Sequence, residues 1–233
     1  MKIVNARKIP DMVKPIARPE PKPAIIHRPS QISATDFDQW ITDPYGFYVK
    51  KILKIRQKNL IDEPPSVALR GSLIHDILAE FSVCYPTGKL PKDAGDKLNK
   101  ILEAHLSKWS NISYIDLFWR QKLSIILDWF LEEECRRRND SFQVVVEKEG
   151  RVEFPIGQRL ILITARADRI ELNQGNNYQI IDYKTGNPPS KLAVSSGTAV
   201  QLLVEAAILL KGGYNLSDQK VQDIELFYWH LKG

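Results

Sequence analysis

Two apolar segments joined by turn-forming residues 173–177 constrain the fold of this chain more than any other feature. Both segments are rich in Ile, Tyr and other residues typical of strands, so they predict a β-hairpin. An antiparallel register that sets Leu172 opposite Tyr178 also sets Asp168 directly opposite Asp182. Strand side chains alternate with period two, so these two carboxylates share one face of the hairpin.

Like charges that face each other across a ladder destabilise a sheet, and each raises the pKa of the other. A divalent cation between Asp168 and Asp182 would remove this repulsion, and Lys184 lies on the same face. The rest of that face is apolar, which is typical of a site at the edge of a core. An exposed hairpin with Asp168 paired to Arg169 or Lys184 explains the spacing equally well, so both interpretations stand at this point.

Composition places the chain among ordinary globular proteins. Its 233 residues are 43% hydrophobic and 26% charged, with length for one large or two small domains. The two cysteines lack metal-ligand spacing and rule out a disulfide framework or a four-cysteine cluster. No apolar run has the length of a membrane span. We therefore expect a cytoplasmic protein without membrane association.

The net charge of +5 resides in the first 30 residues, which contain seven Lys or Arg and two Asp or Glu. The same segment contains six prolines and few large apolar residues, a composition typical of an extended chain. We expect residues 1–30 to form a poorly ordered basic arm. It can serve as a linker, the interpretation we favour, or as a salt-sensitive contact to nucleic acid. Residues 31–233 are expected to form a single domain.

Hydrophobic periodicity divides that domain into a helical part over residues 31–140 and an α/β part over residues 141–233. The first expected helix begins at Ser33, in a capping box with Asp36, and is broken at residues 43–46. Further helices are expected over residues 47–53, 67–83, 92–109 and 115–138. Strands are expected over residues 142–154, 160–172, 178–185 and 224–231, with a helix over 199–211 before the last. This β-β-β-α-β order predicts an α/β fold with a mixed sheet flanked by helices.

Lys50, Lys51 and Lys54 follow one another closely on the second expected helix. Such a run is usually a solvated helix face, but it also suits contacts to DNA phosphates. The sequence leaves both interpretations open.

Four short motifs occur in order on the expected elements. His75 ends a Gly-x-x-x-His motif on a helix, and residues 165–170 match Gly-Arg-x-Asp-Arg-Ile with alanine in place of the first glycine. Asp-Tyr-Lys follows at residues 182–184, and Gln201 begins a later helix. This order resembles the RecB-like branch of the PD-(D/E)XK nuclease superfamily, and within it the nuclease domain of AddB-type helicase–nuclease proteins.

The resemblance covers about residues 30–233 and implies a restriction-endonuclease-like core. It implies a Mg²⁺- or Mn²⁺-dependent deoxyribonuclease, acting as an exonuclease on linear or single-stranded DNA ends in recombination or double-strand break repair. DNA and an AddA-like helicase are the implied partners. The alternative is a catalytically idle DNA-binding or scaffold component of such a complex.

The family motifs also imply the metal ligands, which are His75, Asp168, Asp182 and the backbone carbonyl of Tyr183. Carboxylate and carbonyl oxygens suit Mg²⁺, and an imidazole favours Mn²⁺ somewhat more. Many AddB-type domains hold an iron–sulfur cluster on four cysteines. This chain has two, so we expect no iron–sulfur cluster.

Lys184 and Gln201 complete the implied catalytic set with Asp168 and Asp182. The lysine would orient or deprotonate the attacking water, or stabilise charge on the phosphate, and the glutamine would hydrogen-bond the water or a phosphate oxygen. Glu205, where the family often has tyrosine, is an accessory candidate. Glu147, on the first strand, is another, although a strand salt bridge also explains it. Arg166 joins the three lysines as a candidate DNA contact.

Overall fold

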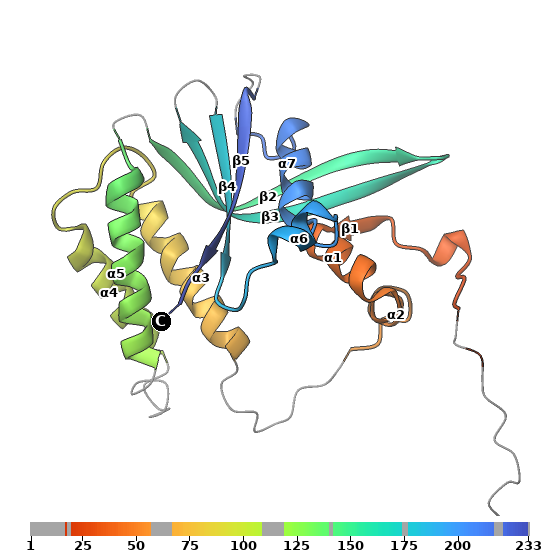
Figure 1. Ribbon diagram of the computed structural model, residues 1–233, viewed down its shortest axis with the longest axis horizontal. Coiled ribbons are helices and arrows are strands. Elements are labelled where there is room, and N and C mark those ends of the chain that lie inside the picture. Colours follow the sequence, from red (N-terminus) through yellow and green to blue (C-terminus); the bar gives the residue numbers. More distant parts are fainter. Residues whose placement is uncertain are drawn as a thin grey trace, which may run out of the picture.

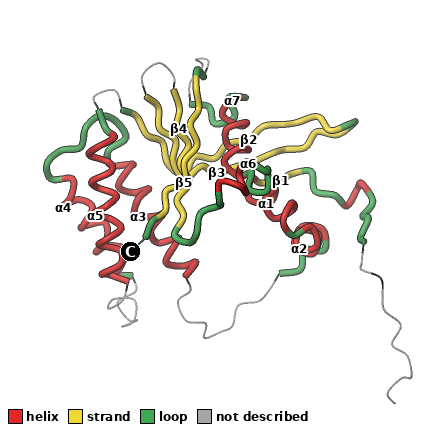
Figure 2. Tube along the Cα trace, viewed as in Figure 1, coloured by secondary structure: helices red, strands yellow, loops and turns green. Residues whose placement is uncertain are grey.

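A five-stranded mixed sheet separates two groups of helices (Figures 1 and 2). This arrangement, seen in a computed structural model, confirms the predicted α/β class. The structure describes residues 17, 20–56, 67–108, 119–139, 142–173, 177–216 and 221–232. Within these residues no helix combines the length and apolarity needed to cross a membrane.

The sheet is organised around one long central strand, β3. The strands are β1 (Gln31–Ser33), β2 (Gln143–Ile156), β3 (Arg159–Asn173), β4 (Asn177–Lys184) and β5 (Asp223–His230). β2 pairs antiparallel along nearly all of β3, so β1 and β4 occupy different stretches of its other edge. β4 is antiparallel to β3, whereas the β1–β3 and β4–β5 pairs are parallel. Beyond β4, β2 and β3 continue as a long two-stranded ribbon (Figure 1).

The hairpin register predicted from the sequence is confirmed. Leu172 pairs with Tyr178, and the β3–β4 ladder continues to Arg169 opposite Ile181. It ends there because the two strands separate at the next residue. The carboxylate of Asp168 then accepts a hydrogen bond from the backbone N–H of Tyr183, at 2.8 Å. The turn residues 174–176 lie outside the described residues.

One group of helices packs against the sheet face that carries the even-numbered residues of β4. It contains α1 (Ala34–Thr42), α2 (Pro44–Phe47), α6 (Lys191–Ser195) and α7 (Gln201–Leu210), with a π-helical turn over Tyr48–Ile52 (Figure 1). The predicted capping box is present at the start of α1. Apolar side chains of α7 pack on this face in a core that includes Ile170, Ile180, Leu202, Ile208 and Tyr214.

The other face is covered by α3 (Val67–Cys84), α4 (Ala94–Ser107) and α5 (Arg120–Arg137). Their apolar side chains surround the odd-numbered residues of β4 in a second core, whose members include Ile74, Phe81, Leu102, Phe130, Ile181 and Trp229. The sheet therefore has a separate apolar core on each face. β4, which carries residues 182–184, is fixed between them.

Three local features differ from the prediction. β1 and α6 were not predicted, because three and five residues are too short to show a hydrophobic period. Residues 43–46 were predicted to break the helical region. Instead, α2 begins at Pro44, and the Asp43 side chain caps it by accepting a hydrogen bond from Gly46 N–H, at 2.9 Å. Proline suits the first position of a helix because its missing N–H is not needed there.

The end of the predicted basic arm lies beside β3. Residues 25–27 form a short 3₁₀ turn, and the Arg159 side chain donates to the Ile25 carbonyl at 3.1 Å. The backbone of Leu162 donates to the Ser30 carbonyl at 2.8 Å, directly before β1 begins. The rest of the arm, residues 1–16 and 18–19, lies outside the described residues.

Candidate active site

The candidate site lies where the sheet divides, at the point at which β3 leaves β4. Asp168 marks this point on β3, and Glu147 is the residue of β2 that would pair with it. The β2–β3 ladder omits this pair, and Glu147 has a φ of 51°, in the left-handed region. A non-glycine residue in that region costs about 1–3 kcal/mol, and such strain is common at functional sites. The distortion thus coincides with the two carboxylates.

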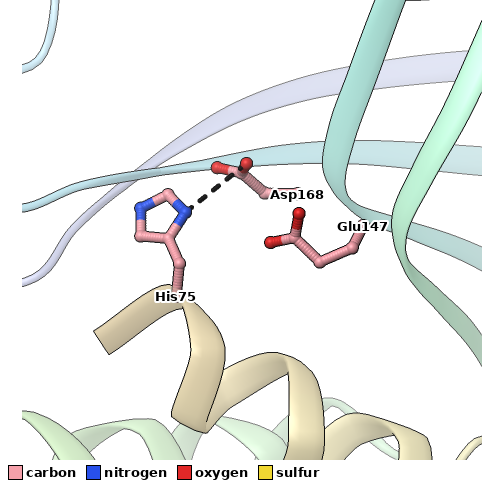
Figure 3. A group of neighbouring side chains, drawn as sticks. All are labelled: His75, Glu147 and Asp168. Atoms are coloured by element: carbon pink, nitrogen blue, oxygen red, sulfur yellow. Dashed lines mark ion pairs between the residues drawn. The ribbon is translucent and has the colours of Figure 1, made fainter. Parts of the chain in front are cut away.

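α3 brings His75 to the same point (Figure 3). Its Nδ1 atom lies 3.5 Å from a carboxylate oxygen of Asp168, and its Nε2 atom lies 3.1 Å from the backbone carbonyl oxygen of Tyr183. His75, Glu147 and Asp168 each offer a ligand atom, and these three atoms lie within 4.8 Å of one another. One imidazole and two carboxylates therefore converge from three elements.

This donor set fits a divalent metal ion. Carboxylate oxygens suit Mg²⁺ and Mn²⁺, and the imidazole nitrogen favours Mn²⁺. The Tyr183 carbonyl lies against the imidazole and adds a further oxygen. Glu147, predicted only as an accessory residue, belongs to this group, whereas Asp182, predicted as a ligand, does not.

Asp182 instead begins a chain of polar contacts on the α7 side of the sheet. Its Oδ2 atom pairs with Lys184 Nζ at 2.6 Å, and its Oδ1 atom accepts from the Gln201 amide at 2.5 Å. The same Gln201 nitrogen donates to Glu205 Oε1 at 3.1 Å, and Gln201 Oε1 accepts from Lys184 at 3.3 Å. All of these contacts agree with one orientation of the amide. Gln201 therefore links the lysine to both acidic side chains.

Burial and mutual charge shift the pKa values of these groups. Burial raises the pKa of Asp182, which Lys184 opposes and Asp168 reinforces. Burial also raises the pKa of Glu147, against the charge of Arg166. Burial lowers the pKa of His75, but its hydrogen bond to Asp168 and the surrounding carboxylates outweigh that effect and leave the pKa raised. The site thus favours protons, and by the same electrostatics a bound cation.

Burial raises the pKa of Glu205 to about 8, with a smaller contribution from Asp182 and against the hydrogen bond from Gln201. The folded protein therefore binds a proton here that the unfolded chain has released above its ordinary pKa of 4.5. Between these values stability falls as pH rises, by about 1.4 kcal/mol per pH unit from this group. We predict that Glu205→Gln removes this slope, measured by urea unfolding of the metal-free protein from pH 4.5 to 8.

The exposed Glu132 on α5 provides the matched control, since Glu132→Gln makes the same chemical change away from the site. An unchanged slope in Glu205→Gln would contradict the assigned proton.

The four basic residues predicted to contact DNA lie in two places. Arg166 is part of the site, because it pairs with Glu147 at 2.5 Å. Lys50 donates to Gln39 at 3.4 Å and Lys51 pairs with Asp36 at 2.6 Å, both next to α1. Lys54 is exposed, with a φ of 57°. Their contacts to DNA remain a prediction.

A buried ionic network behind the site was not predicted from the sequence. Arg169 is fully buried and pairs with Glu134 at 2.5 Å and Glu171 at 2.7 Å. Its guanidinium also donates to the Tyr183 hydroxyl at 3.3 Å, so the network reaches the strand that carries Asp182 and Lys184. Arg169 stands next to Asp168 in the recognised motif. The sequence signal was therefore visible, but its partner on α5 was not.

Comparison with known proteins agrees with this geometry. The family model of the PD-(D/E)XK nuclease superfamily matches residues 31–233. The chain belongs to that superfamily. Its fold and the motifs that carry the resemblance follow the expectation from the sequence.

Three relatives illustrate the range of similarity. Uncharacterized proteins of Rickettsia conorii and Rickettsia felis are 36% and 34% identical over 196 and 194 residues, which cover 81% and 82% of this chain and 23% of each relative. An ATP-dependent helicase/deoxyribonuclease protein of Acetivibrio thermocellus, named as one of the subunits of that enzyme, is 25% identical over 229 residues, 87% of this chain and 20% of that protein. The chain thus spans less than a quarter of the length of these relatives.

Proposed function

We propose that this nuclease-superfamily member is a Mg²⁺- or Mn²⁺-dependent deoxyribonuclease, acting as an exonuclease on linear or single-stranded DNA ends in recombination or double-strand break repair. The observation that carries the proposal is the convergence of His75, Glu147 and Asp168 beside the Lys184–Asp182 pair. A strand of ordinary structure has no reason to gather an imidazole, three carboxylates and an ammonium group at one point.

In this proposal His75, Glu147, Asp168 and the Tyr183 carbonyl hold the metal ion, and Asp182 joins them. A bound Mg²⁺ or Mn²⁺ supplies positive charge to the phosphate and acidifies a water molecule. The hydrogen bond from Tyr183 N–H holds the Asp168 carboxylate in place. Asp182 is buried and divides its two oxygens between Lys184 and Gln201, so its orientation is also fixed.

Lys184 acts on the substrate rather than on the metal. Its side chain is 30% exposed, so one side of the ammonium group remains open to a phosphate or to the attacking water. Negative charge grows on the phosphate oxygens during hydrolysis, and a preorganised cation stabilises it. Gln201 holds the ammonium through its side-chain oxygen. We assign Lys184 to charge stabilisation and water positioning, and Gln201 to the orientation of Lys184.

The proposed partners are DNA and an AddA-like helicase in the cytoplasm. Two relatives named as components of an ATP-dependent helicase/deoxyribonuclease support the helicase partner. Lys50, Lys51, Lys54 and Arg166 are the proposed DNA contacts. Arg166 suits this role because its side chain is 61% exposed while its guanidinium already lies at the site.

The test compares end-labelled linear DNA with closed circular DNA of the same sequence, in Mg²⁺, in Mn²⁺ and in EDTA. We expect metal-dependent loss of the linear substrate only, and loss of activity in Asp182→Ala. Degradation of both substrates would make the enzyme an endonuclease. DNA binding without cleavage of either substrate would favour the idle DNA-binding or scaffold role.

A further inference from the structure

A cavity of about 720 Å³ lies next to the proposed metal site, between β1, the β2–β3 ribbon and α7. This volume falls within the roughly 300–1,000 Å³ typical of small-molecule pockets. Gln201 and Glu205 form part of its wall, and so does Arg166, which pairs with Glu147. The cavity and the site are therefore neighbours that share side chains.

The charges on the cavity wall balance. Two acidic side chains, Glu149 and Glu205, stand against two basic ones, Arg151 and Arg166. Arg166 is already paired with Glu147, so the wall offers little net attraction for a second phosphate. The other polar groups are neutral hydroxyls and amides from Gln31, Ser33, Thr35, Thr164 and Asn215. This lining suits a neutral ligand that carries several hydrogen-bonding groups.

Glu205 adds a second, independent indication of a ligand. Its side chain is buried to 1% exposure, and its Oε1 atom accepts from Gln201. Its Oε2 atom is buried and has no hydrogen-bond partner among the described residues. A buried polar atom in that state costs about 1–3 kcal/mol, so such atoms are rare unless something else satisfies them.

We propose that this cavity receives the nucleoside adjacent to the phosphate held at the proposed metal site. The inference rests on the proposed nuclease function and adds a base-binding pocket to it. A nucleobase is neutral and carries both donors and acceptors, which matches the lining and the free oxygen of Glu205. The shared wall residue Gln201 places the pocket one side chain away from Lys184 and Asp182.

A base that enters the cavity has to leave its stack and its pairing partner. That step costs a few kcal/mol in a duplex and little in a single strand. The pocket therefore selects unpaired nucleotides, whereas the metal site by itself treats every phosphodiester alike.

The experiment fills the cavity and measures two substrates. Thr35 lines the cavity from the exposed start of α1, so Thr35→Trp places an indole at its mouth. Thr42→Trp makes the same change at the exposed other end of α1, outside the cavity, and is the matched control. Each variant of the full chain is assayed on single-stranded DNA and on methyl p-nitrophenyl phosphate, a diester without a nucleoside. Thermal melting verifies folding, and Leu162→Trp fills the cavity from β3 should Thr35→Trp not fold.

We expect Thr35→Trp to lower the ratio of DNA cleavage to diester cleavage by about tenfold, the order of one lost base contact. Thr42→Trp should keep the wild-type ratio. An unchanged ratio in the folded tryptophan variants of the cavity would overturn the base pocket and leave the nuclease function standing. Absence of metal-dependent cleavage of both substrates by the wild type would overturn the proposed function, and the pocket with it.

Discussion

Lys184→Ala should lower the kcat of metal-dependent DNA cleavage by about 10²–10³-fold, the usual effect of removing one preorganised group that stabilises transition-state charge. The same change should not weaken Mn²⁺ binding. It removes a positive charge from beside the metal site and releases Asp182 from its ion pair, and both effects favour a cation. Kinetics on labelled DNA and calorimetric titration with Mn²⁺ measure the two quantities separately.

The control for this experiment is Lys211→Ala. Lys211 is exposed directly after α7 and has the same formal charge, but it belongs to no contact of the site. Cleavage by Lys184→Ala at the wild-type rate would remove Lys184 from the catalytic set. A parallel loss of Mn²⁺ affinity and activity would instead assign it to the integrity of the metal site.

Arg169→Met should lower the free energy of unfolding by about 3–5 kcal/mol, the usual cost of removing one partner from a buried ion pair. The side chain is fully buried between Glu134 and Glu171, and the substitution leaves both carboxylates short of a partner. Methionine has a similar length and keeps much of the packing. Urea unfolding measures the loss, and the unchanged slope of the transition verifies that the unfolded states are comparable.

Arg136→Met is the matched control. Arg136 also pairs with a glutamate on α5, Glu133, but its side chain is 70% exposed. An exposed pair of this kind contributes about 0–1 kcal/mol. Equal stability of the two variants would show that the buried network does not brace the sheet. A large loss confined to Arg169→Met would show that it does, and would explain how Tyr183 and its strand are held in place.

The β3–β4 hairpin is the part of the site that follows from local sequence. A turn-rich segment between two alternating strands leaves one register that buries the apolar face, and the observed pairing of Leu172 with Tyr178 is that register. The approach of Asp168 to the strand of Asp182 is a consequence of this register. The position of Gln201 at the first turn of α7 follows in the same way, from helical periodicity.

Glu147 shows where local sequence stops being informative. Its place in the metal-binding group depends on pairing with a later strand, β3, and on a left-handed backbone at that one position. Nothing in the neighbouring residues requires a positive φ. For the same reason a strand salt bridge explained Glu147 equally well from the sequence. The structure gives it both that contact, with Arg166, and a place beside His75.

The amino-acid pattern alone determined the α/β class, the hairpin register and the motifs that identify the superfamily, because each depends on periodicity or spacing along the chain. The tertiary structure decided which carboxylate joins His75, how Gln201 connects Lys184 to Glu205, and that Arg169 is buried beside a partner from α5. Those outcomes depend on distances between elements far apart in sequence, which are set only when both faces of the sheet are packed.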